Sequence, residues 1–259
     1  MPRLVVVTGF KKSGKTSLIE ALTGELRRRG HRVGVIKHTV RPYPIDTPGK
    51  DTWRYRAAGA QASVLLTQGE SAIFLQLPLE LNEVIRLLGT LDLVLLEGFK
   101  ELDRAPRIVV AETLQEFEEL EKGLEIVVTG KIAGSLRKEL GVPVLGSNAI
   151  SVLADLVEKK SMPLLPGLNC ARCGYSSCKE LARAVLNGEA EATKCVNLLS
   201  EETRVFVDGA PLVVNPFVGK VIKNVVMGII STLKGVESPR SVEVRFIVEK
   251  ESSEGGEQP

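Results

Sequence analysis

The stretch that decides the fold is GFKKSGKT, residues 9–16. It fits the pattern G-x-x-x-x-G-K-[ST], the Walker A motif of a loop that binds nucleotide phosphates. An apolar run, residues 4–7, leads into it, and a helical pattern over residues 17–29 leads out. In that setting the glycines let backbone N–H groups converge on phosphate oxygens, and the positive end of the helix dipole adds to the attraction. We therefore expect a P-loop between a strand and a helix, with a nucleoside triphosphate as its ligand.

The polar residues of this loop have individual roles in that interpretation. Lys15 should reach the β- and γ-phosphates, and the hydroxyl of Thr16 should bind Mg²⁺. The remaining positions expected to bind nucleotide are Gly9, Lys12, Ser13, Gly14 and Ser17. The alternative is a glycine-containing turn with a surface lysine, which the flanking strand and helix patterns disfavour.

Short apolar runs alternate with helical patterns over the first 160 residues or so. The expected strands are residues 4–7, 33–36, 63–66, 72–75, 93–96, 107–110, 125–128 and 142–145. The expected helices, each ending shortly before a glycine, are residues 17–29, 51–58, 79–88 and 113–121. Continuous apolar strands are typical of a parallel sheet covered on both faces, and the TQGES turn (67–71) predicts one antiparallel hairpin. The predicted fold class is α/β: a P-loop NTPase-type, doubly covered, mostly parallel sheet.

A carboxylate should lie near the loop, at the end of a neighbouring strand. The apolar run ending at Leu96 is followed directly by Glu97. Ligands of open α/β sheets bind at the carboxyl ends of the strands, so Glu97 is placed to hold Mg²⁺ through water or to orient a nucleophilic water. Asp92 begins the same strand and is expected at the opposite edge. The alternative for Glu97 is a strand-end carboxylate that only faces solvent.

Composition excludes several classes of protein. The chain has 259 residues, a formal net charge of +2 and 44% hydrophobic residues. A charge this close to zero argues against a broad nucleic-acid-binding face. No apolar run approaches the roughly twenty residues of a membrane span, and the short run before the loop does not match a signal peptide. We expect a cytoplasmic protein that binds neither nucleic acid nor membrane.

The cysteines are confined to one short segment. All four lie between positions 170 and 195, at Cys170, Cys173, Cys178 and Cys195. Clustered cysteines in a cytoplasmic protein of this size more often bind metal than form disulfides. The spacing C-x2-C-x4-C-x16-C suits a [4Fe–4S] cluster or a structural zinc ion. The cluster is favoured because zinc modules more often have two C-x2-C pairs, and free thiols are the third alternative.

A linker is expected at SMPLLPG, residues 161–167, because its prolines and glycine break the periodicity. The expected domains are a nucleotide-binding domain (1–162), a four-cysteine module (168–198), a small α+β unit of unknown role (200–250) and a disordered polar tail (251–259). The middle of the cysteine module, residues 177–187, is helical in pattern. Within the α+β unit we expect two strands around Asp208-Gly209, a helix from Pro216 to about Leu233, and a strand over 242–248.

Three stretches together resemble one family. They are GFKKSGKT (9–16), VIKHTVRPYPIDTPGKDTWRYRAAGA (35–60) and LLEGFK (95–100). The combination resembles the molybdopterin-guanine dinucleotide biosynthesis protein B (MobB) family over roughly residues 3–158. The resemblance implies a GTP-binding P-loop protein that forms a homodimer and is at most a weak GTPase. It implies an accessory role, in which the protein assists a molybdopterin guanylyltransferase-type enzyme that attaches a guanine nucleotide to molybdopterin, the cofactor of molybdoenzymes.

Further site residues come from this resemblance. Lys37, His38 and Lys100 match family motifs and are expected to bind nucleotide. Asp46 is expected as a second Mg²⁺-side carboxylate and, with Glu97, as a catalytic residue that orients water. The loop of residues 37–51 that contains Asp46 is long enough to be functional, and ordering by a γ-phosphate is a recurring switch device.

Two other stretches qualify the resemblance. Thr129-Gly-Lys131 lies where a guanine-reading loop is commonly found but lacks its aspartate, so the residues permit GTP while the family implies it. Arg54 and Arg56, on the helix after the long loop, are expected to be solvated charges; the alternative is that one of them neutralises phosphate charge, within the subunit or across a dimer. The segment from Cys170 to Cys195 is similar to the small four-cysteine iron–sulfur domain of anaerobic redox and carbon-monoxide/acetyl-CoA pathway proteins.

Two functions from different classes are consistent with the sequence. The first is a GTP-binding accessory protein of molybdenum cofactor biosynthesis that carries an iron–sulfur module. The alternative is a redox or regulatory protein in which nucleotide binding gates access to an iron–sulfur cluster.

Overall fold

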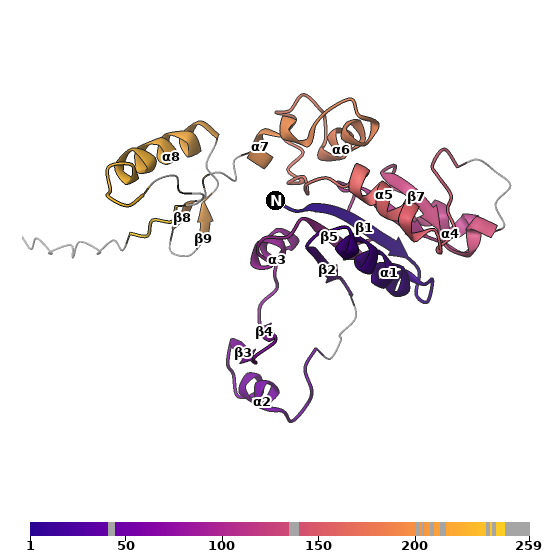
Figure 1. The fold of residues 1–259 in the computed structure, drawn as a ribbon, viewed down its shortest axis with the longest axis horizontal. Coiled ribbons are helices and arrows are strands. Elements are labelled where there is room, and N and C mark those ends of the chain that lie inside the picture. Colours follow the sequence, from indigo (N-terminus) through magenta and orange to yellow (C-terminus); the bar gives the residue numbers. More distant parts are fainter. Residues whose placement is uncertain are drawn as a thin grey trace, which may run out of the picture. The chain divides into compact units, whose positions relative to one another are not determined.

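A computed structural model describes residues 1–40, 45–134, 140–199, 203, 205–207, 210–212, 216–236, 239 and 242–246. The chain forms two compact units, Met1–Leu198 and Leu199–Pro259 (Figure 1). Among the described residues, no helix has both the length and the apolar character needed to cross a bilayer.

A five-stranded parallel sheet forms the centre of the first unit, with the strand order β2-β5-β1-β6-β7. Its strands are β1 (Arg3–Gly9), β2 (Val33–Lys37), β5 (Leu93–Glu97), β6 (Arg107–Val110) and β7 (Glu125–Thr129). The continuous apolar runs thus predicted these strands correctly. The strand expected at 142–145 is reduced to a single bridge, Val144 with Val128, because Gly141 and Pro143 interrupt the extended run.

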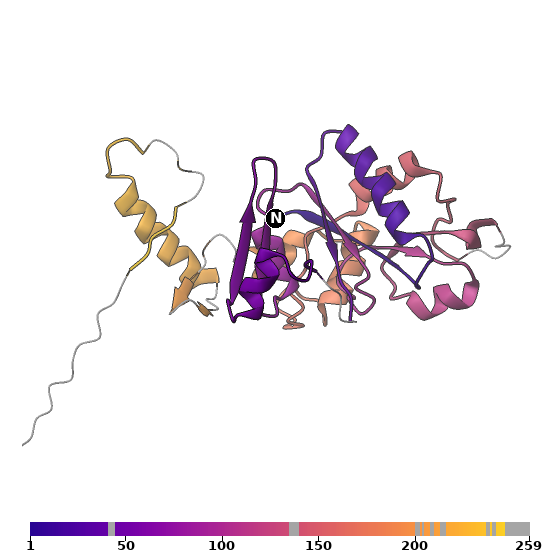
Figure 2. The same ribbon diagram turned by 90° about the horizontal axis from the view of Figure 1, so that it is seen from below.

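Helices cover both faces of this sheet, as the apolar strands predicted. They are α1 (Lys15–Arg28), α3 (Leu81–Leu87), α4 (Leu114–Leu120) and α5 (Ile150–Lys160), and a short 3₁₀ turn, η1 (Lys131–Gly134), follows β7. Val5 and Val7 of β1 share a core with α1 and α5, whereas the alternate residues Leu4 and Val6 face Ile85 of α3. Figure 2 shows α1, in indigo, lying along the sheet. Helix α5 was not predicted.

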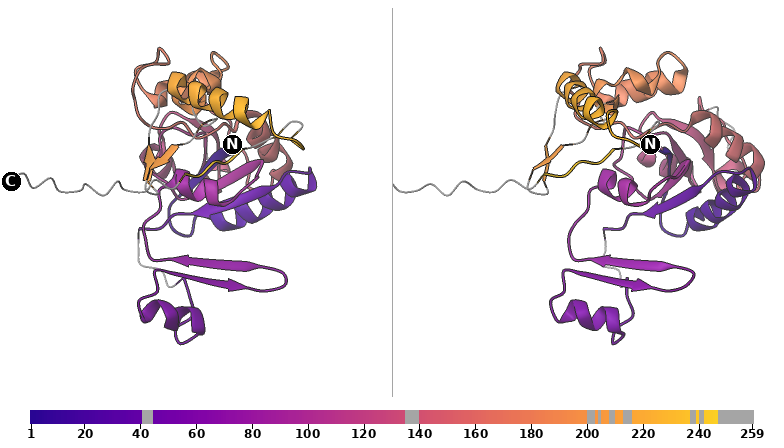
Figure 3. Two further views of the ribbon diagram at one scale, coloured as in Figure 1. Left: turned by 90° about the vertical axis from the view of Figure 1, so that its left-hand side faces the viewer. Right: turned by 60° about the vertical axis from the view of Figure 1, so that its left-hand side comes forward.

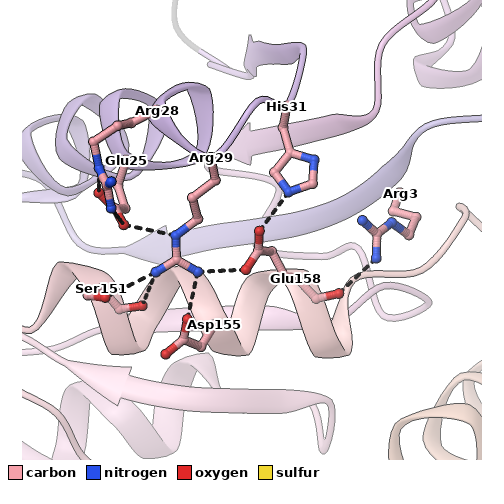
Figure 4. A network of polar contacts seen from close by, with 8 residues as sticks. All are labelled: Arg3, Glu25, Arg28, Arg29, His31, Ser151, Asp155 and Glu158. Atoms are coloured by element: carbon pink, nitrogen blue, oxygen red, sulfur yellow. Dashed lines mark hydrogen bonds and ion pairs between the residues drawn. The ribbon is translucent and has the colours of Figure 1, made fainter.

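The carboxyl end of α1 is tied to α5 by a polar network (Figure 4). The guanidinium of Arg29 donates to the carboxylates of Asp155 and Glu158, each at 2.6 Å. The ring of His31 lies 2.6 Å from a second oxygen of Glu158. Arg29 also donates to Glu25, one turn earlier on α1, at 2.8 Å. These contacts fix the direction of the helix whose opposite end carries the P-loop.

A helix and a hairpin form what we call the arm, residues 45–77. It contains α2 (Asp51–Ala57) and the antiparallel strands β3 (Ala62–Leu66) and β4 (Ser71–Leu75), so the predicted hairpin is confirmed. Both views in Figure 3 show α2 beside this hairpin. The side chain of Gln76 donates to the carbonyl of Arg56 at 3.0 Å, which links the two.

The cysteine segment packs within the same compact unit as the sheet. It contains α6 (Cys178–Asn187), a 3₁₀ turn η2 (Ala192–Lys194) and α7 (Val196–Leu199). Helix α6 starts at Ser177, which caps it by accepting from the N–H of Glu180, and stops at Gly188, as the sequence predicted. Leu181 and Ala182 belong to the core that contains α1. The division at residues 162 and 168 into separate domains stays a prediction.

Contacts of this segment lie at the amino edge of the sheet, where the strands begin. Met162 bridges Leu4 at the start of β1. The guanidinium of Arg104, which precedes β6, donates to the carbonyl of Leu165 at 2.8 Å. The chain therefore leads from α5 into the cysteine segment along the edge opposite the P-loop.

The second unit contains a short hairpin and a helix. They are β8 (Val205–Val207), β9 (Ala210–Leu212) and α8 (Pro216–Ile230), which confirms the predicted order of two strands and a helix. The predicted strand over 242–248 is wrong for the described residues 242–246, which pair with no strand and expose Phe246. The Asp208-Gly209 turn and the tail 251–259 lie outside the described residues.

Candidate functional site

The loop of residues 9–16 lies at the carboxyl edge of the sheet, where the strand order reverses. Strand β1 ends at Gly9, between β5 on one side and β6 on the other, and α1 begins at Lys15. In open α/β sheets a ligand binds in the crevice formed at such a switch point. The loop therefore occupies the position at which this class of fold binds phosphates.

Local backbone geometry explains two of the loop's glycines. A Cβ at Gly9 would lie 2.5 Å from the carbonyl oxygen of Val110 on the neighbouring strand, so only glycine fits there. Gly14 caps α1 with φ of 93°, a left-handed conformation that favours glycine. The N–H groups at the start of α1 are thereby presented at the loop. Lys11 and Lys12 are exposed to solvent beside it.

Lys15 lies against the loop that precedes it. Its Nζ donates to the carbonyl of Phe10 at 2.5 Å and approaches the hydroxyl of Ser13 at 3.4 Å. Burial lowers the pKa of the Lys15 ammonium, and the nearby positive charges of Lys100 and Lys37 lower it further, against the opposing effect of Glu97. The ammonium groups of Lys15, Lys37 and Lys100 are close enough for their charges to interact, and together they create a local positive field that suits a polyphosphate.

Glu97 lies where the sequence placed it, at the carboxyl end of β5, and is only 8% exposed. Its Oε1 accepts from the hydroxyl of Thr16 at 3.3 Å and from the ammonium of Lys37 at 3.1 Å. Parallel pairing sets Glu97 level with Val7 and Lys37, so the ends of β5, β1 and β2 meet here. A hydroxyl beside a carboxylate is the kind of oxygen pair that Mg²⁺ accepts. Asp92, at the opposite end of β5, binds Arg32 instead.

The turn after Glu97 brings Lys100 to the loop. The ammonium of Lys100 lies 3.9 Å from the centre of the Phe10 ring. The ring of Phe99 lies 5.1 Å from that of His38, whose backbone N–H donates to the carbonyl of Glu97. The predicted nucleotide-binding residues Lys15, Thr16, Lys37, His38 and Lys100 are therefore close to one another or to Glu97, while their roles stay predictions.

Asp46 lies in the arm and has other partners. Its carboxylate accepts from the guanidinium of Arg56 at 2.9 Å, from the hydroxyl of Thr52 at 3.2 Å and from the N–H of Thr47 at 2.8 Å. The expectation that Arg56 is a solvated charge is wrong, because its side chain is only 16% exposed and its guanidinium lies 5.0 Å from the Phe74 ring centre. Arg54 is largely exposed, as expected.

A second polar pair flanks the loop on the β7 side. Lys131, which follows β7, forms an ion pair with Glu112, which follows β6, at 2.8 Å. Gly130 has φ of 104° and lies so close to the carbonyl of Ala111 that a Cβ would be 2.5 Å from it. The Thr129-Gly-Lys131 stretch thus lies at the same edge as the P-loop.

The four cysteines line a single pocket at the other end of the unit. Cys170 is exposed, Cys173 and Cys178 are half-buried, Cys195 is buried, and all four are free thiols. The side-chain amide of Asn197 donates to the sulfur of Cys170 at 3.1 Å. Burial raises the pKa of the Cys195 thiol, and the nearness of Cys178 and Cys173 adds to the effect.

Convergence of four thiols on one pocket fits the four-cysteine ligand set of an iron–sulfur cluster, and equally that of zinc. Within the described residues, no three His, Cys, Asp or Glu side chains are close enough to form a closed metal-ligand set. The four thiols therefore share a pocket without forming a closed ligand set in the described part of the chain.

One buried residue near the site was missed by sequence reasoning. Arg107 is fully buried at the start of β6, and its guanidinium donates to backbone carbonyls of the turn that carries Lys100. The signal was present as an arginine at the head of an apolar strand, where charged side chains are rare unless paired.

Comparisons with known proteins match both parts of the chain. The family model for molybdopterin guanine dinucleotide synthesis protein B matches residues 4–129. A second model, described as "Putative Fe-S cluster", matches residues 165–196, a range that includes all four cysteines.

Similar proteins and structures agree with these models. The chain is 32% identical to the "Putative molybdopterin-guanine dinucleotide biosynthesis adapter protein" of Methanocaldococcus jannaschii, over 96% of this chain and 99% of that protein. It is 34% identical to the "Molybdopterin-guanine dinucleotide biosynthesis adapter protein" of Haemophilus influenzae, over 60% of this chain and 87% of that protein. The crystal structure of Bacillus subtilis MobB matches with a TM-score of 0.53 at 27% identity, over 62% of this chain and 98% of that one.

Proposed function

This chain belongs to the molybdopterin guanine dinucleotide synthesis protein B (MobB) family, and on that premise we propose that it is a GTP-binding adapter in molybdenum cofactor biosynthesis. It assists the attachment of a guanine nucleotide to molybdopterin. The observation that carries the proposal is the meeting of the P-loop with the Glu97 turn at one switch point, where Thr16 contacts Glu97 and Lys100 lies over Phe10. The partner is a molybdopterin guanylyltransferase-type enzyme, and the adapter acts as a homodimer.

Nucleotide binding follows from the chemistry of the residues at this edge. The loop N–H groups and Lys15 bind the β- and γ-phosphates, and Lys37 and Lys100 add charge on the strand-end side. Thr16 and Glu97 would hold Mg²⁺, which would supply positive charge to neutralise the phosphates. Glu97 orients water for at most slow hydrolysis of GTP. Asp46 would have to exchange its contact with Arg56 to bind the metal, so its Mg²⁺-side role stays a prediction.

The cysteine pocket would hold a [4Fe–4S] cluster through Cys170, Cys173, Cys178 and Cys195. One observation favours the alternative function, a redox or regulatory protein gated by nucleotide: Cys195 belongs to the same buried core as Leu18 and Leu22 of α1. In that case the state of the thiols influences the P-loop helix.

Anaerobic purification followed by metal analysis and nucleotide titration tests the proposal. We expect about four irons per chain, Mg²⁺-dependent binding of GTP in preference to ATP, and co-purification with a molybdopterin nucleotidyltransferase of the same host. Lys15→Ala should abolish GTP binding, whereas Lys11→Ala, at an exposed position of the same loop, should reduce it only slightly. Preference for ATP would contradict the adapter proposal, and zinc without iron would contradict the cluster.

A further inference from the structure

Arg107 is a buried charge that binds backbone rather than carboxylate. Its side chain is fully buried at the start of β6. Its Nη2 donates to three carbonyls, those of Phe99 at 3.2 Å, Lys100 at 3.1 Å and Leu102 at 3.2 Å, while Nη1 donates to the carbonyl of Leu120 at 3.0 Å. In the described part of the chain, no carboxylate forms an ion pair with this guanidinium, and its Nε–H has no acceptor.

Burying a guanidinium without a carboxylate partner costs free energy, so this arginine is expected to have a structural role that offsets the cost. A buried charge is stable only when hydrogen bonds replace its lost hydration, and apolar side chains would fill the same space at lower energetic cost. A guanidinium presents five N–H donors in a rigid planar fork. Here three carbonyls of one short turn converge on a single nitrogen of that fork. The turn of residues 99–102 is therefore the structure that Arg107 holds.

The backbone of this turn is in a conformation that is unfavourable without stabilising contacts. Gly98 has φ of 96° and Phe99 has φ of 41°, so two successive residues are left-handed and one of them carries a large side chain. A non-glycine residue in this region costs about 1–2 kcal/mol. A Cβ at Gly98 would lie 2.9 Å from the carbonyl oxygen of His38, so this position of the turn requires glycine.

The turn ends in the side chain that reaches the loop. Lys100 lies over the Phe10 ring, and its charge acts on the Lys15 ammonium. Because Arg107 binds the carbonyl of Lys100 itself, movement of the arginine would move the lysine backbone directly.

We propose that Arg107 is a positioning residue for nucleotide binding: by holding the carbonyls of residues 99–102 it fixes the Lys100 ammonium above the P-loop, where it contacts the nucleotide phosphates. The inference rests on the proposed function, since it assumes that a nucleotide binds at this loop. The effect of Arg107 on nucleotide binding acts through Lys100 alone, whereas a general contribution to folding would not depend on that lysine.

A double-mutant cycle on the full-length protein tests this inference. The measurements are GTP affinity in the presence of Mg²⁺ and the melting temperature, for Arg107→Lys, Lys100→Met and the double variant. A lysine at position 107 retains the charge but has one nitrogen on a shorter side chain, so it cannot bind the Leu120 carbonyl and the carbonyls of the turn together. We expect Arg107→Lys to weaken GTP binding about tenfold, the size of one charge-assisted contact, but to change it less than twofold when Lys100 is already methionine.

Arg104→Lys is the matched control, because Arg104 also donates to a backbone carbonyl but does so at the amino edge of the sheet. It should leave GTP affinity unchanged. If Arg107→Lys proves unfolded by its melting curve, Phe99→Gly is the second variant: it removes the ring beside His38 and increases the backbone freedom of the same turn while leaving Arg107 in place. It should show the same dependence on Lys100.

The outcomes separate the inference from the function on which it rests. Failure of the unmodified protein to bind GTP would overturn the proposed function and this inference together. Normal GTP affinity in Arg107→Lys, or an equal loss with and without Lys100, would overturn the inference alone, since a purely structural effect does not depend on that lysine.

Discussion

The hydroxyl of Thr16 donates to the carboxylate of Glu97 across 3.3 Å, although the two residues are 81 positions apart in the sequence. The contact joins the first turn of α1 to the end of β5. Lys37, at the end of β2, reaches the same carboxylate oxygen at 3.1 Å. Three separate parts of the chain therefore meet at one oxygen atom, beside the loop of residues 9–16.

Glu97→Gln should raise the Mg²⁺ concentration that GTP binding requires. The amide keeps the shape of the side chain but removes the negative charge that favours a divalent cation, so we expect the Mg²⁺ concentration for half-maximal binding to rise about tenfold. Titration of GTP affinity against Mg²⁺ measures this. Glu101→Gln is the control, since the Glu101 side chain is 90% exposed. An unchanged Mg²⁺ requirement in Glu97→Gln would remove Glu97 from the metal site.

Gly98→Ala should destabilise the protein and weaken nucleotide binding. The alanine would need a left-handed backbone with its Cβ 2.9 Å from the carbonyl oxygen of His38. We expect a loss of about 1–3 kcal/mol in the free energy of unfolding. Gly24→Ala is the matched control, because Gly24 lies inside α1 with no atom within 4 Å of the added Cβ. That change should stabilise the protein by about 0.5–1 kcal/mol, and urea unfolding measures both.

Asp46→Asn should destabilise the arm and leave the Mg²⁺ requirement of GTP binding unchanged. The change removes the ion pair with Arg56, whose guanidinium then lies largely buried without a counter-charge. Faster hydrogen exchange across residues 62–75, with a Mg²⁺ requirement within twofold of normal, is the expected result. Asp51→Asn, at a mostly exposed position, should change neither quantity. A Mg²⁺ requirement raised as far as in Glu97→Gln would instead support the predicted metal-side role of Asp46.

Cys195→Ala should destabilise the metal-free protein more than Cys170→Ala does. Cys195 is 5% exposed and belongs to the core shared with α1, whereas Cys170 is exposed. We expect a difference of about 1 kcal/mol, the effect of losing one small buried side chain. Thermal unfolding under reducing conditions measures it. Equal melting temperatures for the two variants would show that the cysteine segment does not share the core.

The contacts of the Glu25 carboxylate with Arg28 and Arg29 should make the free energy of unfolding depend on pH. Hydrogen bonds from Arg28 and Arg29 lower the pKa of Glu25 from 4.5 to about 2. Ionised Glu25 therefore favours the folded state above pH 4.5, and this stabilisation is lost as the pH falls towards 2. Urea unfolding should show a stability gap between the unmodified protein and Glu25→Gln that narrows across this range. A constant gap would contradict the assigned contact.

The sheet and the loop could be predicted because their signals are local. Continuous apolar runs specified β1, β5, β6 and β7, and the glycine–lysine spacing specified the turn between β1 and α1. Glu97 was found for the same reason, since the end of an apolar strand marks the edge at which it lies. The helix α5 could have been found by the same rule, because its buried residues Leu153, Ala154 and Val157 follow helical spacing.

The missed features depend on partners that the sequence does not mark. The position of Arg107 at the head of an apolar strand marks a buried charge, but its partners are carbonyl groups, which every residue has, so the sequence does not mark which ones it binds. Arg56 was taken for a solvated charge because its carboxylate partner lies ten positions away, beyond the helix. The run 242–246 alternates correctly for a strand, but a strand requires a neighbour, and a sequence pattern does not provide one.

Anchoring of the cysteine segment at the amino edge of the sheet has a consequence for protein lifetime. Strand β1 has seven residues, and at about 3.3 Å each they separate the two edges by about 20 Å. A group bound by the thiols and a nucleotide at the loop therefore do not touch, yet each stabilises the one core between them by mass action. Loss of a group bound by the thiols would raise the unfolded fraction of the whole unit and its exposure to proteases, and a bound nucleotide would slow that turnover.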